Sequence, residues 1–281
     1  MGFFDKILKK ENDNDNKFLE IVKANDDGEE WAQEIISQRW KQEPNLLDKI
    51  ARARIQLYSN AAHQGDETAQ YYMGLAEGKL GNAKESYKWL YRLANNGNVK
   101  AMSAIAMQYS ELGCYGYDKE KEFEWNLKAA EAGDADSQCR VALEYSIDGK
   151  EMEALNWYAK AAQQSSSKGC LGYGKTLSTM KLKYYKNYSK EKLEEMQTEI
   201  EDAYIDAINL AKNRDDYSSA ASALGYFYMF TDVKRSVYFL YRAYEVDNDR
   251  QGDYNEALEL CREHGIDINS VEKIGEELFG D

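Results

Sequence analysis

The sequence predicts an all-α protein built from stacked antiparallel helix pairs. One residue in 281 is proline, and 43% of the residues are hydrophobic. Proline removes a backbone hydrogen bond from a helix, so its near absence favours long uninterrupted helices. A motif of small residues, glycine and aromatic residues also recurs at the intervals expected for a helix-pair repeat. Together these observations predict an ordered chain with one continuous apolar core.

The repeat is defined by four anchor residues, each of which follows a Leu-Ala or Ala-Ala pair and precedes a small residue four positions later. The anchors are Gly65, Gly97, Gly133 and Ser165, spaced 32, 36 and 32 residues apart. Glycine readily adopts the left-handed conformation that ends a helix, and the Asp, Asn or Ser residue after each anchor can cap the next helix. Each anchor therefore predicts a turn between two helices.

The other motif positions predict how the helices pack. Small residues such as Ala69 and Gly74 allow two helices to approach closely, while Trp89, Trp125 and Trp157 fill the space beside them. Each repeat is therefore predicted to be an antiparallel helix pair. Neighbouring pairs must stack, because a single pair cannot bury its apolar face.

Two more copies extend the array, with small residues at matching offsets. The earlier copy is aligned on Gly28 and the later copy on Asp216. The 51 residues between Ser165 and Asp216 exceed one repeat, so we expect an insertion at about residues 181–201. The inserted sequence predicts a lysine-rich connection followed by an extended helix.

The pattern W-x-x-x-A-A-x-x-G-x-x-x-A-x-x-x-L-G-x-x-Y resembles the motif of the Sel-1-like repeat (SLR) family, which is related to the tetratricopeptide repeat (TPR). The resemblance extends over residues 28–246. It implies a right-handed α-solenoid, an SLR/TPR-like superhelix, that acts as a protein-binding scaffold or adaptor without chemistry of its own. Secreted SLR proteins often carry a cysteine pair in each repeat, and a proline is common in the longer helix-to-helix loops of the family. Both features are absent here, and only the repeat after Gly97 keeps an extended loop, at residues 113–118.

The chain divides into three predicted regions. Residues 1–16 combine a short amphipathic stretch with a polar linker, and the amphipathic part is too short for stable membrane association. Residues 17–246 are predicted to form the repeat array. Residues 247–281 are predicted to form an acidic cap, with helices expected at 254–264 and 270–279.

Several absences favour a cytoplasmic location. Asp5 and Lys6 interrupt the N-terminal apolar residues, so we expect no export signal. Lys6 also occupies the position at which myristoylation requires Ser or Thr. No apolar stretch reaches the length of a membrane-spanning helix. The four cysteines lack a CxxC spacing, which indicates reduced thiols. The family resemblance adds the expectation of a bacterial cell.

The net charge of −14 indicates which partners to expect. Nucleic acid and anionic membranes are disfavoured, because binding to either depends on an excess of Lys and Arg. A protein partner fits better, in particular a basic one. Residues 245–281 contain 12 acidic and 3 basic side chains, whereas residues 181–192 contain five lysines and one glutamate. We therefore expect a basic partner to contact an acidic surface formed by Glu256, Glu259 and Glu263.

Residues 169–176 match the phosphate-loop pattern G-x-x-x-x-G-K-[ST], with Lys175 and Thr176 at its end. A phosphate loop must follow a buried β-strand, but the preceding residues 155–164 predict a helix. Gly169 and Gly174 also occupy small positions of the repeat, so helix packing explains them. A nucleotide-binding enzyme is therefore the least favoured function.

No cofactor, metal site or catalytic residue is expected. His63 and His264 lie about 200 positions apart, and neither has a His, Cys or carboxylate partner at metal-ligand spacing. Both are expected to be structural. Cys139 and Cys170 fall inside repeat helices and are predicted to be core or groove residues.

The expected binding site is the concave groove. In related solenoids the first helix of each pair lines this face, where residues recur at fixed offsets from the anchor. Offsets of three, six and ten select an apolar stripe: Trp31, Tyr71, Leu75, Met107, Cys139, Leu143, Leu171 and Tyr226. Such side chains either pack between repeats or recognise a peptide or helix. The sequence leaves both interpretations open.

Two non-enzymatic functions follow from these patterns. One is an SLR-type adaptor that binds a partner through the concave groove. The other is a cytosolic immunity or inhibitor protein that neutralises a basic toxin or effector, for which an acidic scaffold is suited. The two functions share a fold and differ only in the partner. The pattern also leaves the oligomeric state open.

Overall fold

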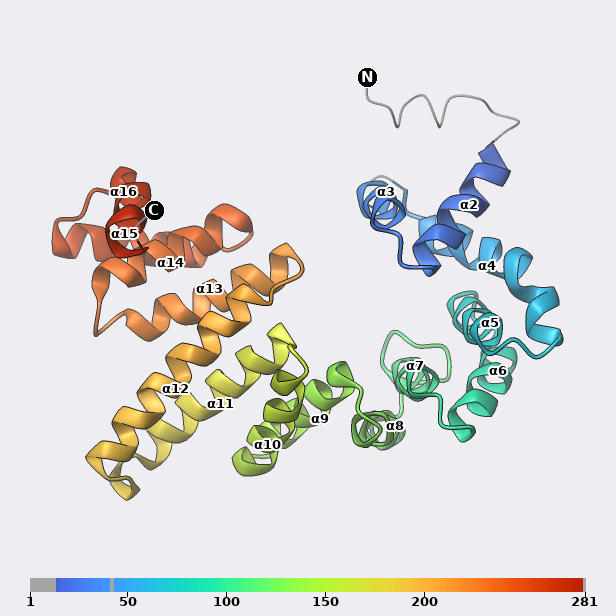
Figure 1. The fold of residues 1–281 in the computed structure, drawn as a ribbon, viewed down its shortest axis with the longest axis horizontal. Coiled ribbons are helices and arrows are strands. Elements are labelled where there is room, and N and C mark those ends of the chain that lie inside the picture. The colour runs from blue at the N-terminus through green and yellow to red at the C-terminus, as the bar shows by residue number, and fades with distance from the viewer. Residues whose placement is uncertain (1–13, 41–42, 280–281) are drawn as a thin grey trace. The chain divides into compact units, whose positions relative to one another are not determined.

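The computed structural model describes residues 14–40 and 43–279, which form helices joined by short connections and contain no β-strand. The chain divides into two compact units, unit 1 (Met1–Ala132) and unit 2 (Gly133–Asp281). Within each unit, most consecutive helices turn back on one another and pack side by side (Figure 1). The prediction of an all-α chain built from helix pairs is confirmed.

Unit 1 contains seven α-helices among its described residues. They are α2 (Asn14–Asp26), α3 (Glu30–Trp40), α4 (Leu46–His63), α5 (Glu67–Lys79), α6 (Ala83–Asn95), α7 (Val99–Tyr109) and α8 (Lys119–Glu131). The only proline, Pro44, precedes α4 instead of interrupting a helix. The one long connection lies between α7 and α8 and includes the extended loop expected at residues 113–118.

Unit 2 contains eight α-helices among its described residues. They are α9 (Ala135–Ile147), α10 (Glu151–Gln163), α11 (Ser167–Tyr184), α12 (Lys190–Asn209), α13 (Arg214–Tyr228), α14 (Val233–Val246), α15 (Gln251–His264) and α16 (Val271–Phe279). Short 3₁₀ turns lie at Tyr185–Asn187 and Ile268–Ser270. The C-terminal helices expected at 254–264 and 270–279 are α15 and α16.

The anchors adopt the left-handed conformation that the motif predicts. The φ angle is +100° at Gly65, +89° at Gly97, +101° at Gly133 and +59° at Ser165. At Gly65 the turn is closed by hydrogen bonds from the Gly65 amide to the Ala62 carbonyl (3.1 Å) and from the Asp66 amide to the Ala61 carbonyl (3.0 Å). These bonds satisfy carbonyl groups that the end of α4 would otherwise leave unpaired.

The residue after each anchor caps the next helix, as expected. Its side-chain oxygen accepts a hydrogen bond from the amide three residues later. The distances are 2.6 Å for Asp66, 3.0 Å for Asn98, 2.7 Å for Asp134 and 3.1 Å for Ser166. Each such cap contributes about 1 kcal/mol to stability, so the turn and the start of the next helix are specified together.

Small residues bring the two helices of a pair into close contact. A Cβ atom at Gly74 would lie 2.5 Å from Cγ of Leu90, and one at Gly225 would lie 2.7 Å from Cγ of Leu240. Both leucines are fully buried. Glycine therefore sets the approach of α5 to α6 and of α13 to α14.

The three tryptophans of the motif are not equivalent. Trp89 and Trp125 are buried beside the small residues, as expected. Trp157 is only half-buried, and the Lys160 ammonium lies 3.8 Å from the centre of its ring. This contact shields the open face of the indole and is a cation–π interaction.

Three expectations differ from the structure. α2 begins at Asn14, inside the segment expected to be a linker. The lysine-rich part of the insertion is not simply a connection, because α11 continues to Tyr184 before α12 begins. The aligned anchor Asp216 does not form a turn. It lies in the first turn of α13, whose cap is Asn213, because the extra residues allow this helix to start earlier.

Two further observations concern the membrane. The amphipathic stretch expected near the N-terminus lies outside the described residues. Among the helices that are described, none combines the length and the apolar character needed to cross a bilayer.

Candidate functional site

The predicted groove residues all lie on alternate helices. We call α3, α5, α7, α9, α11 and α13 the A helices. The first five each follow an anchor or the aligned Gly28, and α13 contains the aligned Asp216 in its first turn. α3 carries Trp31, α5 carries Tyr71 and Leu75, α7 carries Met107, α9 carries Cys139 and Leu143, α11 carries Leu171 and α13 carries Tyr226. The fixed offsets thus select the same helix in every pair.

Half of these side chains are exposed and half are partly buried. The exposed fraction is 45% for Trp31, 51% for Met107, 52% for Leu143 and 43% for Tyr226. The partly buried side chains are Tyr71, Leu75, Cys139 and Leu171. Packing between repeats therefore accounts for the partly buried residues, and the exposed residues are left accessible at the surface.

In unit 1, the partly buried residues of the stripe pack against the core that holds the helix of the exposed Met107. Tyr71 and Leu75 of α5 pack against the core formed by α6, α7 and α8, which includes the fully buried Leu90 and Ile105. Met107 lies on α7 beyond this core and is exposed. Its side chain is thus held on a helix whose other face is fixed by packing.

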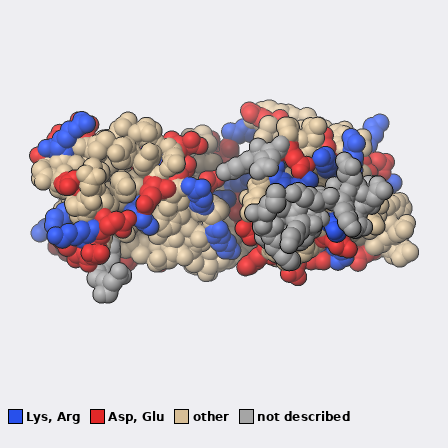
Figure 2. Space-filling view, turned by 90° about the horizontal axis from the view of Figure 1, so that it is seen from above, with Lys and Arg blue, Asp and Glu red and all other residues tan. Residues whose placement is uncertain are grey.

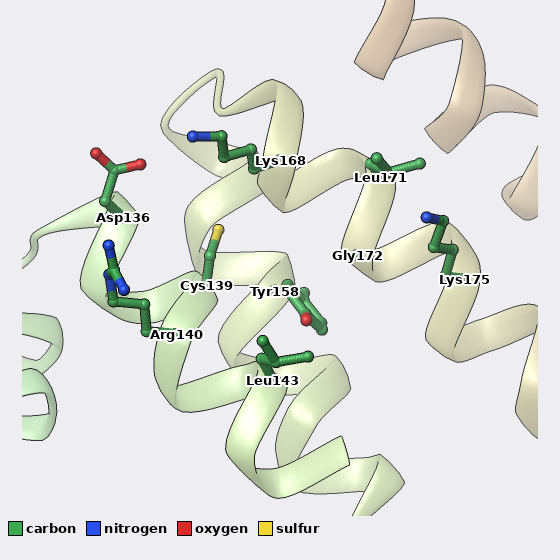
Figure 3. A pocket seen from close by; sticks show the side chains of 9 residues that line it. All are labelled: Asp136, Cys139, Arg140, Leu143, Tyr158, Lys168, Leu171, Gly172 and Lys175. Atoms are coloured by element: carbon green, nitrogen blue, oxygen red, sulfur yellow. The ribbon is translucent and has the colours of Figure 1, made fainter. Parts of the chain in front are cut away.

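In unit 2, the predicted residues line a pocket between α9, α10 and α11. The pocket has a volume of about 380 Å³. Its apolar part is formed by Cys139 and Leu143 of α9, Leu171 of α11, and Tyr158 of α10, which lies between the two A helices (Figure 3). Gly172 keeps α11 close to this tyrosine, since a Cβ atom there would lie 2.2 Å from the ring.

The same pocket is lined by three cations and one carboxylate. Arg140 and Asp136 come from α9, and Lys168 and Lys175 come from α11. Figure 3 shows Asp136, Arg140 and Lys168 at one end and Lys175 beside Leu171 at the other. The side chain of Lys175 retains solvent contact, yet desolvation by the surrounding protein and the nearby Arg250 charge lower its pKa. The pocket is therefore locally positive in an acidic chain.

The charged lining was missed by the sequence interpretation, although part of its signal was present. Lys168 and Lys175 lie three and ten residues after the anchor Ser165, at the same offsets that selected the apolar stripe. They were not selected because only apolar side chains were expected to define the groove. Arg140 lies at a different offset, and Tyr158 belongs to the second helix of a pair, so neither could be found in this way.

The phosphate-loop match forms part of a helix. Residues 169–176 lie inside α11, where the Thr176 hydroxyl donates a hydrogen bond to the Gly172 carbonyl (2.8 Å). A Cβ atom at Gly169 would lie 2.6 Å from the backbone nitrogen of Ala162, and one at Gly174 would lie 2.7 Å from the ring of Tyr204. Helix packing therefore explains these glycines, and Lys175 points instead toward the pocket.

His63 packs against its neighbours, and the Cys139 thiol is not activated. Nδ1 of His63 donates a hydrogen bond to the Ser59 carbonyl (2.7 Å), and its ring packs edge-on against Trp89. Burial raises the pKa of the Cys139 thiol to about 11, which disfavours the reactive thiolate. Within the described part of the chain, no group of three or more His, Cys, Asp and Glu side chains could hold a metal ion.

The predicted acidic surface lies on α15. Glu259 and Glu263 are exposed, whereas Glu256 is half-buried. Arg262 lies beside them on the same helix, so the surface is less uniformly acidic than the composition of the C-terminal region indicates. Acidic and basic side chains are also interspersed on the face of the molecule in Figure 2.

Comparison with solved structures identifies the fold. A protective antigen of uropathogenic Escherichia coli that displays an SLR fold is similar over 83% of this chain and 52% of its own length, with 19% identity and a TM-score of 0.55. A Sel1 repeat protein from Oxalobacter formigenes is similar over 73% of this chain and 89% of its own, with 17% identity and a TM-score of 0.50. This chain has a Sel1-like repeat fold.

The comparisons by sequence add no further relationship, because no protein-family model and no curated protein matches this chain. The chain spans about half the length of the Escherichia coli antigen. The Sel1-like fold explains why the anchors, the caps and the small positions recur together, since each repeat must form the same turn and the same helix contact.

Proposed function

We propose that this Sel1-like repeat protein is a non-enzymatic adaptor that binds a protein partner through the exposed surface of its A helices. The main support is the recurrence of exposed apolar side chains at fixed positions, namely Trp31, Met107, Leu143 and Tyr226. Aromatic and methionine side chains of this kind dominate the binding energy of many protein interfaces. Rigid helices present them, so little conformational entropy is lost on binding.

The free thiols support a cytoplasmic site of action. All four cysteines are unpaired, and Cys170 and Cys261 are buried. Reduced cysteines without a disulfide partner are typical of proteins in the cytoplasm.

The proposal is tested by affinity capture from a lysate of the source organism, followed by identification of the bound proteins. The test variant carries Met107→Ala and Leu143→Ala, which remove one exposed A-helix side chain from each unit. The control variant carries Leu112→Ala and Leu182→Ala, which remove side chains that are also exposed but lie outside the stripe. We expect the test variant to bind the captured partner about tenfold or more weakly, and the control to bind as the natural chain does. Equal binding by both variants would contradict the proposal.

A second candidate function is the inhibition of a basic toxin or effector, as an immunity protein does. It is supported by the exposure of Glu259 and Glu263 on α15. If a basic partner docks there, replacing Glu256, Glu259 and Glu263 by Gln should slow association at low salt and leave dissociation nearly unchanged, because surface charges act mainly on the encounter. An association rate that does not change would rule out this surface as the docking site.

A further inference from the structure

The pocket between α9 and α11 contains an excess of positive charge that the protein itself does not neutralise. Among the described residues, the side chains of Arg140, Lys168 and Lys175 form no ion pair and no hydrogen bond. Some other lysines of unit 2 do form ion pairs. Nζ of Lys183 lies 2.6 Å from Glu151, and Nζ of Lys234 lies 3.0 Å from Glu277.

Composition does not explain this cluster. The chain has 50 acidic and 36 basic side chains, so carboxylates outnumber cations in the chain as a whole. In the pocket, one carboxylate, Asp136, faces three cations. The formal charge of these four side chains is therefore +2, in a protein whose net charge is −14. A ligand that enters this pocket gains from carrying negative charge.

The apolar lining between the cations limits the class of ligand. Tyr158 forms the floor, and Leu143 and Leu171 lie on either side of it. Leu143 is more than half exposed, so an apolar group placed against it would remove hydrophobic surface from water. A bare phosphate or a nucleic acid backbone would leave this surface uncovered.

The two ends of the pocket have separate cations. Arg140 and Lys168 lie at one end, and Lys175 lies beside Leu171 at the other (Figure 3). An extended peptide can place acidic side chains at both ends and an apolar side chain over the floor between them. Arginine and lysine bind carboxylates through charge-assisted hydrogen bonds, which are stronger than neutral ones.

We propose that this pocket binds a partner segment in which acidic residues flank an apolar residue. The inference rests on the proposed function, since it assigns a chemistry to the partner on α9 and α11. The acidic side chains pair with Arg140, Lys168 and Lys175, and the apolar side chain packs against Tyr158, Leu143 and Leu171. The partner is thus locally acidic at this site, whatever the charge of the rest of its surface.

The test uses four arrays of short synthetic peptides: acidic with apolar residues, basic with apolar residues, neutral with apolar residues, and acidic with polar residues only. The full chain is applied to all four, and Kd values of the strongest peptides are measured by fluorescence anisotropy. The pocket variant carries Lys168→Glu and Lys175→Glu. The control variant carries Lys186→Glu and Lys273→Glu, which change the net charge equally at exposed positions outside the pocket. Circular dichroism verifies that both variants fold.

We expect the acidic-apolar peptides to bind best and the pocket variant to bind them about tenfold or more weakly, with the control unchanged. Raising the ionic strength should weaken binding, because the contacts are between charges near the surface. A third variant, Leu143→Ala, should also weaken binding if the apolar residue occupies the floor.

Three outcomes would overturn the inference. Equal binding of the peptides by the pocket and control variants would refute the proposal of an acidic partner segment and leave the proposed adaptor function in place. Inorganic phosphate or ATP that binds this pocket more tightly than any peptide would show that it takes a small anion instead. Absence of binding to all four arrays would contradict the proposal that the pocket binds an acidic segment. Capture of a partner whose binding is weakened by Met107→Ala would still support the adaptor function.

Discussion

The helix pairs α5–α6 and α11–α12 follow the same motif but differ in helix length, in the anchor residue and in the small residue that follows the anchor. α5 and α6 have 13 residues each, whereas α11 has 18 and α12 has 20. The first pair follows Gly65 at a φ of +100°, and the second follows Ser165 at +59°. The small residue four positions after the anchor is Ala69 in one pair and Gly169 in the other.

The contact inside each pair is nevertheless of the same kind. Gly74 faces the buried side chain of Leu90, and Gly174 faces that of Tyr204. The repeat therefore requires a left-handed turn and a small residue against a large one. Helix length and the identity of the large residue differ between the two pairs. The longer α11 carries Lys181 and Lys183 in its last turn while the pair keeps the same contact.

The largest expected effect tests the small-to-large contact. Leu90→Ala should lower the free energy of unfolding by about 2–5 kcal/mol, because it opens a cavity in a fully buried region. Gly74→Ala alone should lower it by about 1–3 kcal/mol through overpacking. The loss of unfolding free energy in the double variant should be smaller than the sum of the two single losses, because the added methyl group occupies part of the cavity.

Urea unfolding followed by circular dichroism measures all three variants. The cycle of Gly174→Ala and Tyr204→Ala should show coupling of the same sign in the longer pair. Additive losses in either cycle would mean that the two pairs do not share this contact.

A smaller effect tests the difference between Ala69 and Gly169. Gly169→Ala should destabilise the protein by about 1–3 kcal/mol, because its Cβ atom would lie 2.6 Å from the backbone nitrogen of Ala162, which cannot move independently. Gly252→Ala is the matched control. A Cβ atom there has no neighbour within 4 Å, so this change in α15 should be neutral or stabilising by up to about 1 kcal/mol. Similar losses from both substitutions, measured by urea unfolding, would show that α10 and α11 are no closer than other helix pairs.

Much of the fold could be predicted because the motif specifies local structure. Glycine predicts the turn at an anchor, and the Asp, Asn or Ser after it predicts the cap of the next helix. Both form as expected at Gly65 and Asp66. The turn before α13 could not be placed in this way. Asn213 caps a helix that starts before the aligned Asp216, and the alignment on Asp216 does not reveal where the inserted segment ends.

The candidate site was predictable only in part. The offsets placed Leu143 and Leu171 on the A helices, and both line the pocket. The positive charge of the pocket depends on which cations lack a partner, and pairing is a property of the folded chain. Lys183 and Lys175 look alike in the sequence, but α10 supplies Glu151 to Lys183 and supplies no carboxylate to Lys175.

The smallest effect tests the turn itself. Ser165 is the only residue other than glycine with a positive φ among the described residues, and its side chain is exposed. Ser165→Gly should therefore stabilise the protein by about 0.5–1 kcal/mol, because the left-handed conformation strains a residue that has a Cβ atom. Gly65→Ser should cost more than this, since a φ of +100° lies further outside the region open to such residues than +59° does. Thermal unfolding should show a rise in Tm of about 1–2 °C for the first variant and a larger fall for the second. Equal and opposite shifts would indicate that the two turns are strained to the same degree, and a fall for Ser165→Gly would mean that the serine side chain stabilises its own turn.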